Sequence, residues 1–68
     1  MTITYHRKSD LLYIALDERA TQVRNEDLGD DVHLELGEGE CIVGIEILRA
    51  SKRVDLAGLV SLKYAEVA

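Results

Sequence analysis

The stretch from Val32 to Leu48, VHLELGEGECIVGIEIL, decides the predicted fold. Its first five residues alternate strictly between apolar and polar side chains, which is the pattern of a half-buried β-strand. Gly37 and Gly39 follow, and glycine suits a hairpin loop because it adopts positive φ without steric cost. The run Cys41–Leu48 completes the hairpin. Gly44 lies inside that run, where a missing side chain predicts a close backbone contact or a bulge.

The sequence before this hairpin contains three further strand patterns. Leu11–Leu16 is apolar on both alternating faces, which predicts a central strand, or one covered on both sides by a helix or a second subunit. Ile3–His6 alternates and is joined to that strand by the polar turn Lys8–Asp10. Ala20–Asn25 carries charged residues that suit an exposed edge strand, and Glu26–Asp31 is predicted to be a polar loop.

After the hairpin the apolar period lengthens towards that of a helix. Ala50–Arg53 reads as a helical turn, and Asp55 is a residue that can cap a longer helix. Gly58 weakens such a helix by about 1 kcal/mol relative to alanine, so tertiary packing is needed to hold it, and whether residues 54–68 form one continuous helix stays open. The predicted helix carries on one side Leu56, Leu59, Val60, Lys63, Tyr64 and Val67.

Strands first and a helix last predict an α+β fold class. We expect a small antiparallel β-meander of four or five strands with a C-terminal helix packed on one face. The chain contains no proline, no internal repeat and no low-complexity linker. Residues 1–68 are therefore expected to form a single domain.

The size of the chain predicts a thin core. Surface scaling gives an unfolded chain of 7.6 kDa about 11,000 Å² of accessible surface and a folded monomer about 4,300 Å². Burial of the apolar part of the difference yields about 100 kcal/mol, and ordering 68 residues costs about the same. Cys41 is the only cysteine, so no disulfide within the chain adds stability. We therefore expect a homo-oligomer, most simply a dimer.

The charge of the chain bears on its partners and its location. Thirteen acidic and eight basic residues give a net charge of −5, which opposes binding to the phosphates of nucleic acid. This charge indicates either a solvated acidic surface, which is the simpler interpretation, or a small basic protein as a partner. No apolar run reaches the length of a membrane span, and no signal peptide pattern is present. Together with the lone cysteine, these features predict a cytoplasmic protein without membrane contact.

Two segments resemble a family of short bacterial and archaeal proteins of unknown function, DUF2283. DLLYIAL at residues 10–16 is similar to the family pattern D-x-L-Y-I-x-L, with Tyr5 preceding it. IVGIEILRASK at residues 42–52 is similar to the pattern I-V-G-I-E-I-L-x-A-S-K. The resemblance implies a small β-rich fold with a helix and brings no established reaction. It also implies, for some members, an antitoxin-like role beside a toxin.

Candidate catalytic or metal-binding residues are few. His6, His33 and Glu35 fall on the outward sides of their strands, and imidazole and carboxylate groups are common metal ligands. Their spacing matches no compact ligand motif, so we predict no metal, no cofactor and no catalytic residue. The alternative hypothesis is a small-molecule or metal-binding protein, or an enzyme, whose site forms between subunits from these three residues and Tyr13.

The candidates for partner binding are Tyr13, Glu46, Arg49, Lys52 and Arg53. Glu46 lies between isoleucines and would need a basic partner if a second layer covered it. The three basic residues form a small cluster, which is too small for a nucleic-acid groove. The leading prediction is therefore a non-enzymatic, self-associating interaction module that also accepts a basic partner protein.

Overall fold

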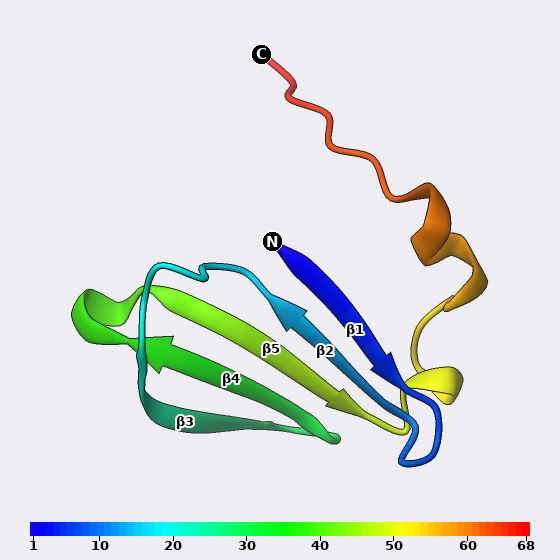
Figure 1. Cartoon of the computed structure of the whole chain (residues 1–68), viewed down its shortest axis with the longest axis horizontal. Helices are drawn as coiled ribbons and strands as arrows, with labels where there is room; N and C mark the ends of the chain where they lie inside the picture. The colour runs from blue at the N-terminus through cyan, green and yellow to red at the C-terminus, as the bar shows by residue number, and fades with distance from the viewer.

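Five antiparallel strands form one sheet in the computed structural model, which describes residues 1–68 (Figure 1). The lateral order of the strands is β1-β2-β5-β4-β3. Their bounds are β1 (Thr2–His6), β2 (Leu11–Ala15), β3 (Gln22–Gly29), β4 (Val32–Gly37) and β5 (Ile42–Leu48).

The strand order makes the predicted meander wrong. β2 pairs with β1 and β5 instead of with β3, so the strand that is apolar on both faces lies inside the sheet, as predicted. The chain then crosses to the far edge, where the charged strand β3 pairs with β4 alone. The crossing is anchored at its start, because the amides of Leu16 and Asp17 both donate to the carbonyl oxygen of Val43, at 2.8 and 3.1 Å. Charged residues favour the edge and apolar residues favour the interior.

Strand β3 is longer than the sequence predicted. It continues to Gly29 through residues that were expected to form a loop, and every residue in it is exposed, as befits an edge. The turn into β4 is short because Asp30 and Asp31 both adopt positive φ, at 51° and 64°. Aspartate tolerates this conformation better than most residues do. The side chain of Asp27 accepts a hydrogen bond from the amide of Gly29 at 2.8 Å.

The prediction of an α+β fold is wrong, because the chain contains no α-helix and the fold is all-β. Its helical residues form three short 3₁₀ helices: η1 (Glu38–Glu40) lies between β4 and β5, and η2 (Ala50–Lys52) and η3 (Ala57–Ser61) follow β5. The amide of Leu62 bonds back three residues to Leu59, at 3.2 Å, which is the 3₁₀ pattern. Leu62 itself has a φ of −56° and a ψ of 134°, so residues 54–68 do not form one continuous helix.

The physical reason is a lack of packing. A helix of this length is marginal in water unless an apolar stripe is buried, and Gly58 weakens it further. Val60 and Tyr64 belong to the predicted stripe, yet their side chains are 92% and 86% exposed. The periodicity is present in the sequence, but within the stripe only Leu56 and Leu59 are partly buried, which is too little burial to hold a helix.

The core is correspondingly small. Only three apolar side chains are buried, those of Leu12, Leu36 and Ala50. The accessible surface of 5306 Å² exceeds by about 1,000 Å² the value expected for a folded monomer of this mass. The molecule measures 34 × 33 × 19 Å, which is the shape of a slab.

Candidate functional site

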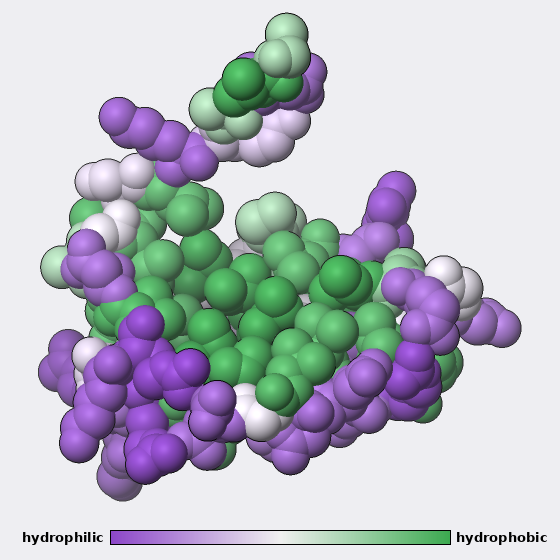
Figure 2. Space-filling view, turned by 180° about the vertical axis from the view of Figure 1, so that it is seen from behind, coloured by the Kyte–Doolittle hydropathy of each residue, from purple (hydrophilic) through white to green (hydrophobic).

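One face of the sheet is apolar across four strands, and we name it the apolar face. The strand register aligns two rows of neighbouring side chains on it. Figure 2 shows hydrophobic residues gathered over the middle of this side of the molecule and hydrophilic residues at its rim. The rows are Ile3, Ile14, Ile45 and Leu34, and Tyr5, Leu12, Ile47 and Val32.

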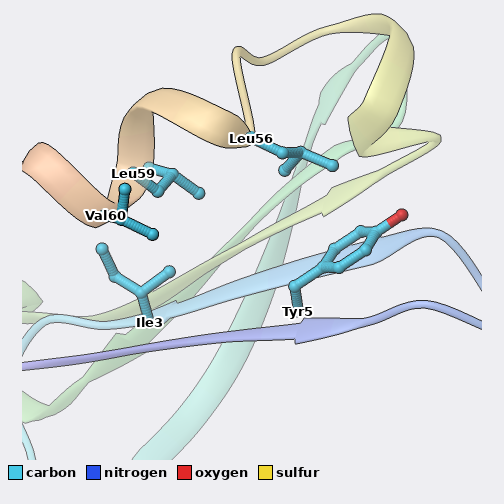
Figure 3. A pocket seen from close by; sticks show the side chains of 5 residues that line it. All are labelled: Ile3, Tyr5, Leu56, Leu59 and Val60. Atoms are coloured by element: carbon cyan, nitrogen blue, oxygen red, sulfur yellow. The ribbon is translucent and has the colours of Figure 1, made fainter.

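The apolar face is covered only at its margin. Leu56, Leu59 and Val60 lie over β1 and line, with Ile3 and Tyr5, an open pocket of about 280 Å³ (Figure 3). Away from this pocket no other element covers the face (Figure 2), and its side chains are partly exposed except Leu12, which is fully buried. This apolar area is the candidate surface for binding another molecule.

The opposite face carries polar groups and centres on Tyr13. Its hydroxyl donates a hydrogen bond to Glu35 Oε1 at 2.6 Å. The ring crosses the backbone of Gly44, where an added Cβ would lie 2.5 Å from the tyrosine oxygen. The close contact predicted at Gly44 is therefore confirmed, and it brings Tyr13 on β2 to Glu35 on β4 across the intervening strand β5.

The carboxylates around Tyr13 change its acidity. The hydrogen bond to Glu35 raises the pKa of the Tyr13 phenol above its ordinary value of 10, and desolvation and the negative charges of Glu35, Glu46 and Glu18 act in the same direction. The phenol is therefore neutral and a hydrogen-bond donor at neutral pH.

The residues of the hypothesised metal site are only partly brought together. His6 lies exposed on the edge strand β1, whereas His33 and Glu35 lie on β4. Two strands separate β1 from β4, a distance of about 14 Å. No three His, Cys, Asp or Glu side chains form a group that could hold a metal ion.

The candidate basic cluster is partly engaged with acidic loop residues. Arg49 Nε donates to Asp31 Oδ2 at 2.6 Å, and Arg53 Nη1 donates to the carbonyl oxygen of Asp30 at 2.5 Å. Lys52 is exposed. These bonds connect the segment after β5 to the β3–β4 turn.

Glu46 lies on β5 between Tyr13 and His33 of the neighbouring strands, at a position that is partly exposed. Its cross-strand neighbours are thus a phenol and an imidazole, and neither is a residue of the basic cluster. The sequence pattern alone did not indicate this pairing.

Sequence reasoning missed a contact between residues that are 41 positions apart. Ser51 donates to Asp10 twice, from its amide to Oδ1 at 2.9 Å and from its hydroxyl to Oδ2 at 2.6 Å. The Tyr5 hydroxyl donates to Asp10 Oδ1 at 2.7 Å, and the amide of Ala50 donates to the carbonyl oxygen of Asp10 at 3.0 Å. These hydrogen bonds connect the β1–β2 turn to η2.

These donors also stabilise the ionised form of Asp10. The hydrogen bond from the Ser51 hydroxyl lowers the pKa of the Asp10 carboxyl below its ordinary value of 3.8, and the bonds from Tyr5 and from the Ser51 amide lower it further. The signal in the sequence was that Asp10 and Ser51 both belong to the segments that resemble the family patterns.

The chain has no helix with the length and apolar character that crossing a membrane requires. Comparison with curated proteins yields no match, and comparison with solved structures yields none either. Residues 2–51 match a family described as a protein of unknown function, DUF2283. The match contains all five strands and ends at Ser51, the residue that bonds to Asp10. Since it covers more than half of the 68 residues, the chain belongs to the DUF2283 family, which is uncharacterised.

Proposed function

We propose that the protein is a non-enzymatic interaction module that works as a homodimer, with the apolar faces of two copies packed against each other. The observation that supports this proposal is the open apolar face. A single sheet that is apolar on one side needs a second layer, and stable domains bury such a face against another sheet or a helix. A second copy supplies that layer and forms a β-sandwich with the first.

The exposed area fits this arrangement. A stable interface of standard size buries about 800 Å² on each partner. The excess of about 1,000 Å² over the surface of an ordinary folded monomer is of the same size, and it includes the exposed residues 62–68 as well as the apolar face. The slab shape, with a short dimension of 19 Å, leaves room for a second layer on the open side.

The chemistry of the face favours an identical partner. None of the side chains in its two rows is ionised at neutral pH, so it can meet a copy of itself without burying a charge. A two-fold axis then brings the same surface together from both copies. The charged strand β3 lies at the edge of the sheet, where its side chains stay in water.

The first test is the mass of the folded protein in solution. We expect light scattering and sedimentation to give twice the chain mass at micromolar concentration, with dissociation to monomers on dilution. A folded monomer at every concentration would overturn the proposal.

Matched variants on strand β5 locate the interface. Ile45→Thr places a hydroxyl on the apolar face, and Leu48→Thr makes a similar change on the opposite face of the same strand. We expect I45T to weaken the dimer and L48T to leave it intact, with both chains folded by circular dichroism. Equal dimerisation of the two variants would place the interface elsewhere.

The second candidate function is the antitoxin-like binding of a small basic protein. The net charge of −5 favours it, together with the exposed acidic residues of β3. Its test is co-expression with the product of a neighbouring gene, where growth inhibition by a basic product should be relieved by this chain. Failure to bind any basic product of adjacent genes would count against this role.

A further inference from the structure

Residues 62–68, which we name the arm, extend away from the sheet after η3 (Figure 1). They contain no helix or strand. Three of their apolar side chains are largely exposed, those of Leu62 at 62%, Tyr64 at 86% and Val67 at 89%. The arm and the apolar face together therefore leave two apolar surfaces in one small molecule without a partner.

We propose that each arm packs along the uncovered margin of the apolar face of the other copy in the dimer, beside the area where the two sheets meet. This inference rests on the proposed homodimer and names a segment that completes its interface. The arm begins next to Leu59 and Val60, which already line the margin of the apolar face beside β1 (Figure 3). Face-to-face packing brings that margin beside the sheet of the second copy.

The arm has the reach for this contact. Seven extended residues span about 23 Å. Two sheets packed face to face lie about 10 Å apart. An extended arm is therefore long enough to bridge this gap and to continue along the margin of the partner's apolar face.

The alternative, packing on the same chain, is disfavoured by the path of the backbone. Residues Leu56–Val60 occupy the margin of the face over β1 (Figure 3), and the chain then turns away from the sheet at Leu62 (Figure 1). The arm therefore does not fold back over the apolar face of its own chain.

A tryptophan in the arm provides a direct test, since the natural chain contains none. In the full-length Y64W variant, we expect the indole emission to shift to shorter wavelengths as the protein concentration rises. The midpoint of this shift should coincide with the dissociation constant measured by sedimentation. Emission that stays at the fully exposed wavelength in the dimer would overturn the inference, and a blue-shifted emission in the monomer would do so as well.

A pair of arm variants tests the contribution to affinity. L62S/Y64S/V67S keeps the length of the arm but removes its apolar side chains, whereas K63S/E66S keeps them. We expect the first variant to raise the dissociation constant at least about tenfold and the second to change it less than about threefold. Equal effects would contradict an apolar contact by the arm.

The two proposals fail in different ways. If the natural chain stays monomeric at all concentrations, the homodimer itself is wrong. If the chain dimerises while the indole of Y64W stays exposed and both arm variants bind like the natural chain, the homodimer stands and only the arm contact is wrong.

Discussion

Asp10 adopts a left-handed conformation with a φ of 52°, and in it both its carboxylate and its carbonyl oxygen face the segment after β5. An aspartate accepts this conformation at lower energy than a branched residue would. The turn residue predicted from the sequence is thus also a long-range hydrogen-bond acceptor. No local pattern reveals the partner of such a residue, because Ser51 is far away in the chain.

The Asp10 carboxyl should titrate abnormally, and Ser51 should be the main cause. We expect its pKa, measured by carbon NMR, to lie below 3.8 in the natural chain and to rise towards 3.8 in S51A. The Asp17 carboxyl, whose low pKa is caused by Arg19, serves as the internal control. An identical Asp10 pKa in both chains would show that Ser51 does not stabilise the carboxylate.

The sign of the pH effect on stability follows from the depressed pKa. The folded state binds the Asp10 proton less tightly than the unfolded state does, so the stabilisation is complete above pH 3.8. It is lost as the pH falls from there through the lower pKa of the folded state. In D10N this part of the acid dependence of unfolding should be absent.

Gly44 should be intolerant of any side chain. In G44A the added Cβ would meet Tyr13 Oη at 2.5 Å and the carbonyl oxygen of Ile14 at 3.0 Å. We expect a loss of about 1–3 kcal/mol in the free energy of unfolding, measured by denaturant titration. The loss should be smaller in a Y13A background, because the ring is then absent. An equal loss in both backgrounds would rule out the tyrosine as the obstacle.

At the scale of elements, the sequence predicts strands better than it predicts their order. The alternation at Val32–Leu36 and the two-sided apolar pattern at Leu11–Leu16 identify β4 and β2 because side-chain direction follows directly from strand geometry. The crossing from β2 to β3 depends on which edges pair, and pairing is a property of the whole sheet. The helical period after Asp55 was misleading, since a stripe forms a helix only where something covers it.

The position of each strand should govern its hydrogen exchange. β5 lies between β2 and β4, whereas β3 has one neighbour and all its residues exposed. We expect the slowest amides in β5 and exchange at least about tenfold faster in β3, measured by NMR in deuterated buffer. Equal protection of the two strands would mean that the sheet opens only as one unit.

At the scale of the whole molecule, the dependence of binding on salt distinguishes the two candidate partners, a second copy and a basic protein. Two copies each carrying −5 repel each other, so added salt screens the repulsion and should tighten the homodimer severalfold between 50 and 500 mM sodium chloride. A complex with a basic protein should weaken over the same range. Sedimentation at several salt concentrations measures whether salt strengthens or weakens each of the two complexes. A homodimer that weakens with salt would argue against an apolar interface.

The sequence predicts a need for more burial but does not locate it. The balance between a thin core and the entropy of 68 residues predicts self-association, and this remains a prediction. The sequence assigned the missing burial partly to a helix, which does not form. The composition of the chain indicates how much apolar surface must be buried. Only the order and register of the strands identify which residues, such as Ile45 and Leu34, share the apolar face.

The strand order also has a consequence during synthesis. β5 is the last strand of the sheet to leave the ribosome, yet it is the strand that joins the β1–β2 pair to the β3–β4 pair. A nascent chain that ends before Ile42 therefore holds two separate hairpins, each with an apolar side and no common core. The sheet is complete only once β5 has emerged, and until then the two hairpins expose apolar sides of the kind that makes folding intermediates prone to aggregate.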